Sequence, residues 1–109
     1  MSEMHDELET LIDRISADHT DQALYLDVEN GGWPAALWDA LEQSGVPHAC
    51  VPTDQGGADL PFDDAMVALR RSAYQCLPIP LAESFIATRL LCKAGLSVPA
   101  GVLTVSVCH

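Results

Sequence analysis

Residues 33–45 read WPAALWDALEQSG, a stretch that combines the signals that begin, bury and end a helix. Pro34 suits the first helical position, where the missing N–H of proline leaves no hydrogen bond unmade. Gly45 suits the position after the last turn, where the backbone becomes left-handed. Three large apolar residues share one helical face between these two positions: Leu37, Trp38 and Leu41. This spacing predicts an amphipathic helix that packs against other helices.

Helical periodicity continues on both sides of this stretch. Apolar residues from Met4 to Ile15 lie on one helical face, and Ser2 is placed to cap the N-terminus of that helix. The expected helices are 4–15, 22–28, 34–44, 61–74 and 81–94. The helix over 61–74 is expected to bury Phe62, Ala65, Met66, Leu69 and Ala73. We therefore predict an all-α chain, a bundle of helices around one core.

The pattern changes near the C-terminus. After Pro99, apolar and polar residues alternate from Leu103 to Val107, which is the period of a β-strand. A single strand is not stable by itself. We therefore expect a helical domain over residues 1–98 and the first strand of a β middle domain over residues 99–109, with the rest of that domain outside this sequence.

The charge of the chain is strongly acidic and unevenly distributed. The 109 residues hold 16 acidic and 5 basic side chains, a formal net charge of −11, and 49% of them are apolar. This apolar content predicts a folded chain rather than a disordered acidic tail. Nucleic acids and anionic membranes bind through cationic side chains, so neither is an expected partner. Residues 1–64 carry 15 acids and one base, whereas residues 65–109 carry one acid and four bases. The two halves are suited to pair with each other or to face different neighbours.

The four cysteines give no metal or redox motif. They are Cys50, Cys76, Cys92 and Cys108, without a Cys-x-x-Cys pair, so a zinc ribbon or thioredoxin-type site would lack its ligands or redox pair. The acidic N-terminus has no apolar segment of a secretory signal, and no run approaches the ~20 apolar residues of a membrane span. We expect reduced cysteines, no metal site and a cytoplasmic protein.

Few residues combine into a catalytic pattern. Gly56-Gly57 lacks the remaining residues of a phosphate loop, so its expected role is to allow unusual backbone conformations. His48 and Cys50 would share one face of an extended segment, which allows a cysteine–histidine dyad. A buried cysteine beside a half-exposed histidine is the alternative. Glu83, the one acid after residue 64, is either solvated or ion-paired, or it faces a pocket.

Residues 33–95 place their motifs in a fixed order. These are Trp33-Pro34, Leu37-Trp38, Leu41, Ser44-Gly45-Val46, Val51-Pro52, Gly56-Gly57, Asp63, Pro78-Ile79-Pro80-Leu81-Ala82-Glu83-Ser84 and Ala94-Gly95. This order resembles the N-terminal helical domain of the acyl-CoA dehydrogenases. The segments PIPLAES (78–84) and VPAGVLTV (98–105) are closer to the bacterial branch that degrades steroids and lipids. Thr53 is a departure, because the family commonly has glutamate after Val-Pro.

The resemblance implies a partial enzyme. It implies the N-terminal portion of an FAD-dependent dehydrogenase that desaturates an acyl-CoA thioester between its α and β carbons. In the family, FAD lies between a middle β domain and a C-terminal helical domain, and the catalytic carboxylate lies in the C-terminal domain. These 109 residues are therefore expected to hold no catalytic, cofactor-binding or metal-binding residue, and to bind no FAD alone. The implied partners are the remaining domains or subunits, an acyl-CoA substrate in the full enzyme, and the other subunits of an oligomer.

The resemblance also implies a role in shaping the substrate pocket. In the family, the early part of the helix that ends at Ala94-Gly95 forms one wall of the acyl pocket. Ungapped anchoring on that pair places four residues on the wall: Ile79, Ala82, Glu83 and Ile86. Their spacing is that of one helical face. A wall of isoleucine and alanine favours an apolar acyl group. Packed core is the alternative interpretation of the same face.

Two other functions remain open from the sequence. One is a non-enzymatic interaction module, an acidic helical bundle or subunit that docks on a partner through the apolar strand edge or the basic last helices. The other is a complete small enzyme that uses Cys50 and His48.

Overall fold

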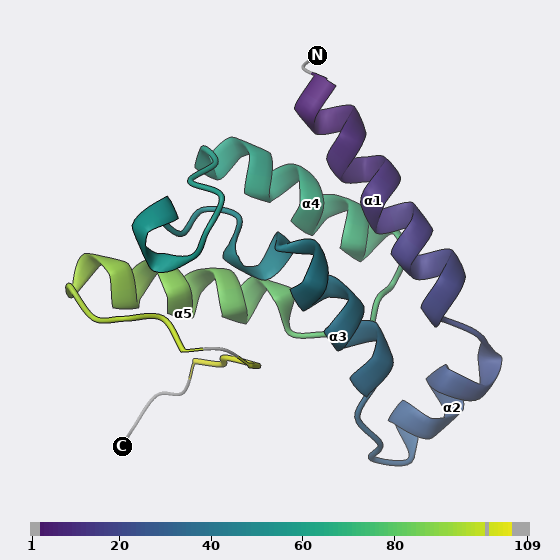
Figure 1. Cartoon of the computed structure of the whole chain (residues 1–109). Coiled ribbons are helices and arrows are strands. Elements are labelled where there is room, and N and C mark those ends of the chain that lie inside the picture. The colour runs from purple at the N-terminus through teal and green to yellow at the C-terminus, as the bar shows by residue number, and fades with distance from the viewer. Residues whose placement is uncertain (1–2, 100, 106–109) are drawn as a thin grey trace.

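The computed structural model describes residues 3–99 and 101–105 of the chain. Its elements follow one another as α1 (Glu3–His19), α2 (Gln22–Glu29), α3 (Ala35–Ser44), α4 (Phe62–Tyr74) and α5 (Leu81–Lys93) (Figure 1). Two short 3-10 turns, η1 (Val46–His48) and η2 (Thr53–Gln55), lie between α3 and α4. No strand forms within the described residues, which confirms the prediction of an all-α chain.

The helix ends follow from their capping residues. The Asp21 side chain accepts a hydrogen bond of 2.8 Å from the Leu24 N–H and so caps α2. Gly45 ends α3 with φ of 84°, and its N–H donates to the Glu42 carbonyl. A side chain at this φ would be strained, which explains why glycine stands there. The helix predicted from residues 33–45 is therefore confirmed, although it begins at Ala35 rather than Pro34.

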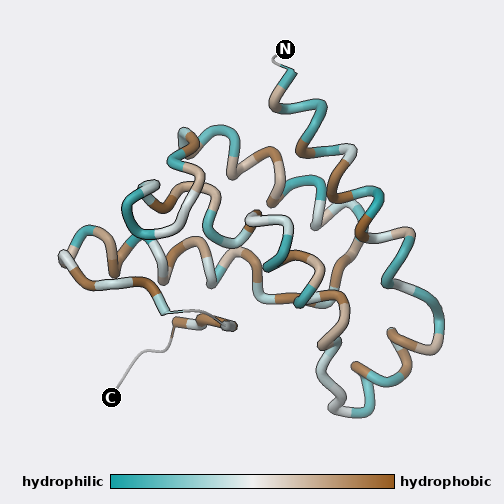
Figure 2. The backbone as a smooth tube through the Cα atoms, in the orientation of Figure 1, coloured by the Kyte–Doolittle hydropathy of each residue, from teal (hydrophilic) through white to brown (hydrophobic). Residues whose placement is uncertain are grey.

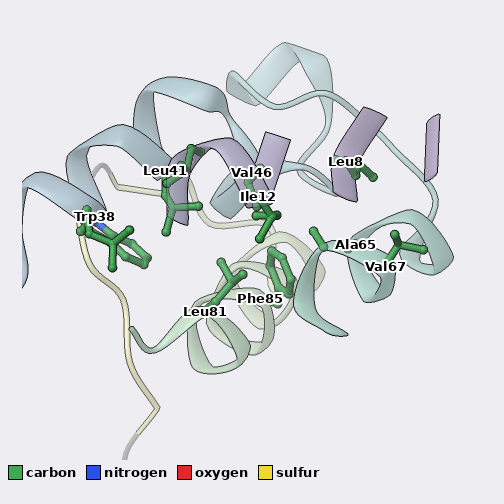
Figure 3. Packing of buried hydrophobic residues seen from close by; sticks show 12 residues of the cluster. Leu8, Ile12, Trp38, Leu41, Val46, Ala65, Val67, Leu81 and Phe85 are labelled. Carbon is green, nitrogen blue, oxygen red and sulfur yellow. The ribbon is translucent and has the colours of Figure 1, made fainter. Parts of the chain in front are cut away.

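One core joins α1, α3, η1, α4 and α5. Apolar residues recur between polar ones along α1, α3, α4 and α5, as expected for amphipathic helices (Figure 2). Figure 3 shows the apolar side chains gathered in one interior, with Phe85 of α5 pointing toward Ile12 of α1. The buried apolar residues of this cluster are Leu8, Ile12, Ile15, Leu37, Trp38, Leu41, Val46, Ala65, Val67, Ala68, Leu81 and Phe85.

Side-chain contacts hold α1 against α4, and those of Arg71 pair the acidic first half of the chain with the basic second half. Arg71 of α4 donates from Nε to Asp13 Oδ1 (2.7 Å) and from a terminal nitrogen to Oδ2 (2.8 Å). Gln75 donates to the same carboxylate at 2.7 Å. At the other end of α1, His5 Nε2 lies 2.8 Å from Asp64 Oδ1. These contacts fix α4 against α1, so part of the charge asymmetry is used within the chain.

The pairing of Asp13 with Arg71 predicts a pH dependence of stability. The hydrogen bonds from Arg71, and that from Gln75, hold the pKa of Asp13 below its ordinary value. The pair therefore stabilises the fold above about pH 4, and this stabilisation is lost as the pH falls through the lowered pKa. We expect Asp13→Asn to lower Tm at neutral pH. The difference in Tm between the variant and the parent chain is expected to become smaller as the pH falls below ~4. Thermal unfolding followed by circular dichroism at several pH values measures this.

A matched control for this prediction is Asp18→Asn, because Asp18 is an exposed carboxylate on the same helix. Asp18→Asn is expected to have nearly the same Tm as the parent chain at every pH. Parallel Tm curves for the parent chain and Asp13→Asn from neutral to acidic pH would contradict the assigned role of the pair.

The segment 101–105 forms no strand, in contrast to the strand predicted over residues 99–109. A strand needs a neighbour for its backbone groups, and none is present in the described part of the chain. The segment is instead joined to α5, where the Ser84 hydroxyl donates a hydrogen bond of 3.0 Å to the Leu103 carbonyl. Val107 and the rest of 106–109 lie outside the described residues, and the division into two domains stays a prediction.

Candidate functional site

The four predicted wall residues do not share one helical face. Ile79 precedes α5 and is half-buried against the core, whereas the other three lie on the helix. The reason is that Ile79 stands between Pro78 and Pro80, which disfavour helical backbone before them. Ile79 therefore does not belong to the predicted helical face, whereas Ala82, Glu83 and Ile86 do.

These three residues of α5 face away from the core. All are exposed, and 52% of Ile86 is accessible to solvent. Leu90, one turn further on, extends the same face and is 56% exposed. Glu83 has no ion pair within the described residues. The packed-core interpretation is therefore wrong for this face, and its role as an acyl-pocket wall stays a prediction.

A cavity of about 360 Å³ lies beside the neighbouring face of α5. It is bounded by the loop that contains η2, by the start of α4 and by the C-terminal half of α5. Its lining residues are Cys50, Val51, Pro52, Leu60, Phe62, Ala65, Phe85, Thr88, Arg89, Cys92 and Lys93. At about 100° per residue, Phe85, Thr88 and Cys92 lie roughly 60–160° around the helix from Ala82 and Ile86, whereas the lining residues Arg89 and Lys93 adjoin that row. The sequence predictions did not include this cavity.

The loop that walls the cavity is held by backbone hydrogen bonds. The Leu60 N–H donates to the Ala49 carbonyl at 2.8 Å, and the Asp59 N–H donates to the Val51 carbonyl at 2.9 Å. The chain passes so close to itself here that a Cβ at Gly57 would overlap the Val51 carbonyl. Gly57 therefore serves a close backbone approach, which the sequence did not predict, whereas the unusual backbone conformation expected of the Gly56-Gly57 pair occurs at Gly56, with φ of 88°.

Arg89, one of the two cations of the cavity lining, stands near an aromatic ring and acts electrostatically on a thiol. The Arg89 guanidinium lies 4.9 Å from the centroid of the Phe62 ring, a cation–π distance. Lys93 is exposed one turn further along α5. Burial raises the pKa of the Cys50 thiol, and the positive charge of Arg89 offsets this rise in part. Arg89 and Lys93 have no ion pair within the described residues.

The proposed Cys50–His48 chemistry finds no support in this geometry. A nucleophilic cysteine needs a lowered pKa, and that of Cys50 is raised. Its thiol lies 3.8 Å from the Pro61 carbonyl and donates toward it. In the described part of the chain, no three His, Cys, Asp or Glu residues are placed to hold a metal ion. The helices of that part are all too short or too polar to cross a membrane.

Comparisons with known proteins give one match. A family model described as "Acyl-CoA dehydrogenase, N-terminal domain" matches residues 2–98. Neither the curated proteins nor the solved structures contain a match. The matched segment covers the five helices and the two 3-10 turns found in the described residues. The resemblance drawn from the ordered motifs of residues 33–95 is thus confirmed, and the chain belongs to the acyl-CoA dehydrogenase family as its N-terminal helical domain.

Proposed function

We propose that this chain forms the N-terminal helical portion of an FAD-dependent acyl-CoA dehydrogenase of the bacterial steroid- and lipid-degrading branch. Its role is to supply part of the acyl-pocket wall and a domain interface. The observation that carries the proposal is the outward face of α5. Ala82, Ile86 and Leu90 follow one another at intervals of four residues and are all exposed.

This face is suited to be covered by apolar material. Residues four positions apart are neighbours on a helix, so the three side chains form a continuous row. Single exposed apolar residues are ordinary on protein surfaces, whereas continuous apolar rows are typical of interfaces or binding grooves. Burial of such surface contributes about 25 cal/mol per Å². An acyl chain or the apolar side of another domain would gain this contribution here.

The flavin belongs to other parts of the enzyme in this proposal. A dinucleotide needs backbone N–H donors for its pyrophosphate, commonly in a glycine-rich turn that begins a helix. The cavity in the described residues has mainly apolar walls and does not fit that requirement. We therefore assign no residue of this chain to FAD. The expected partners are the remaining domains or subunits, an acyl-CoA and the other copies of an oligomer, in the cytoplasm.

The complete reading frame that contains this chain gives the test. We expect it to encode a β-rich segment and a helical segment with an active-site carboxylate, and its product to bind FAD and oxidise an acyl-CoA. In that product, Ile86→Trp is expected to reduce kcat/KM for a medium-chain acyl-CoA by about tenfold, because overpacking of a wall costs roughly 1–3 kcal/mol. Steady-state kinetics with flavin reduction as the signal measure this effect.

The matched control is Leu26→Trp, which enlarges a residue that is equally exposed but lies on α2. It is expected to leave kcat/KM unchanged. Retention of FAD by the 109-residue chain alone during gel filtration would contradict the proposal. If the reading frame encodes no further domain, and the chain binds a protein partner through α5, the interaction-module hypothesis is favoured instead.

A further inference from the structure

The cavity between α4, α5 and residues 50–60 has a composition that the proposed function does not use. Most of its wall is apolar, with the rings of Phe62 and Phe85 and the side chains of Val51 and Leu60. Its volume of about 360 Å³ is that of a small-molecule site, since such sites span roughly 300–1,000 Å³. The binding of an apolar group in such a cavity is favourable, because it removes apolar surface of both the group and the cavity from water.

The charge around this cavity is opposite to that of the chain. The chain has a net charge of −11 and only 5 basic residues. Two of the five, Arg89 and Lys93, line the cavity, and no acidic residue is among its lining residues. Asp64 acts electrostatically on the Cys50 thiol from α4, and His5 stands 2.8 Å from its carboxylate. The cavity therefore combines apolar walls with two cations of α5 that have no ion pair within the described residues.

We propose that this cavity binds a small apolar carboxylate, such as a medium-chain fatty acid, with its alkyl chain against Phe62 and Phe85 and its carboxylate toward Arg89 and Lys93. The guanidinium of arginine holds carboxylates through paired hydrogen bonds, and lysine adds a second charge. A nucleotide or polyphosphate is a poorer fit, because it needs more polar contacts than these walls offer. Ala82, Glu83 and Ile86 are not among the lining residues of the cavity, although Arg89 and Lys93 follow Ile86 by three and seven positions and so adjoin its face of α5. The carboxylate proposal is therefore tested on the 109-residue chain alone, separately from the acyl-wall proposal.

The first experiment titrates the 109-residue chain with octanoate, hexanoate and octan-1-ol by isothermal calorimetry. Octanoate is expected to bind about tenfold more tightly than octan-1-ol, because hydrogen bonds to charged groups are the strong ones. It is also expected to bind more tightly than hexanoate, by about two- to fourfold for each methylene group. Equal affinity for octanoate and octan-1-ol would overturn the proposal.

Variants at the two cations locate the carboxylate. Arg89→Gln is expected to weaken octanoate binding about tenfold, and Lys93→Gln to weaken it less, because lysine contributes as a point charge. Arg89→Lys keeps the charge and is expected to restore part of the affinity. The control is Arg70→Gln, which removes an exposed arginine of α4 outside the cavity. An equal loss in Arg70→Gln and Arg89→Gln would mean non-specific attraction by net charge and would overturn the proposal.

The cysteines supply a second readout that does not depend on any variant. Cys50 and Cys92 line the cavity, whereas Cys76 is exposed outside it. Saturating octanoate is therefore expected to slow alkylation of Cys50 and Cys92 by iodoacetamide several-fold and to leave Cys76 unchanged, as followed by peptide mass spectrometry. Equal rates with and without octanoate at both cavity cysteines would contradict the assigned place of the ligand.

Discussion

Replacement of Ile12 with alanine is expected to lower the free energy of unfolding by about 2–5 kcal/mol. Ile12 is fully buried at the centre of the cluster that joins α1 to α3, α4 and α5. Removal of most of its side chain leaves a cavity that the surrounding helices can close only in part. A domain of this size has a total stability of roughly 5–15 kcal/mol, so the variant is expected to approach the limit of folding. Urea unfolding followed by circular dichroism measures the loss.

The control for this prediction is Leu26→Ala. Leu26 lies on α2 and is 51% exposed, so its truncation removes few packed contacts. A change within about 0.5 kcal/mol is expected for it. If the two variants unfold at the same urea concentration, Ile12 is not at the centre of the core and the assigned packing of α1 is wrong.

The helices were predictable from the sequence because each carries its own signals. Residues 33–45 show this best, since apolar spacing and Gly45 define the helix locally. The buried face of α4 was less predictable. Phe62 is 46% exposed and Ala73 is also exposed, whereas Val67, Ala68 and Ser72 are buried instead. Periodicity gives the existence of a helix, but the face that is buried depends on where α1 and α5 pack against it.

The candidate sites were predictable only in part. Ala82, Glu83 and Ile86 share the face that their spacing predicted, because they lie within one uninterrupted helix. Ile79 does not, because the helix begins after Pro80. The cavity was missed because it joins segments around residues 50–60, 62–65 and 85–93, which only tertiary packing brings together. A usable signal was present: Arg89 and Lys93 stand one turn apart on a helix in a chain with few cations.

Replacement of Gly57 with alanine is expected to destabilise the fold by about 1–3 kcal/mol, the cost of overpacking, and to weaken octanoate binding at the proposed site. A Cβ at this position would overlap the Val51 carbonyl and stand 2.5 Å from the Val51 Cβ. Neither group can move freely, because the same carbonyl accepts a hydrogen bond from Asp59 and the Gly57 N–H donates to Pro52. The loop must therefore open. Urea unfolding and octanoate titration measure the two effects.

The proper comparison for this variant is Gly32→Ala. A Cβ at Gly32 also meets another group too closely, but the group is the carboxylate of Asp27, which ends an exposed side chain and can rotate away. The two glycines thus differ in whether the obstacle is backbone or a movable side chain. Gly32→Ala is expected to change stability by about 0.5 kcal/mol or less and to leave octanoate binding unchanged. Equal losses in the two variants would mean that the loss of glycine flexibility, rather than the contact with Val51, determines the effect, and the loop would then not owe its shape to that close approach.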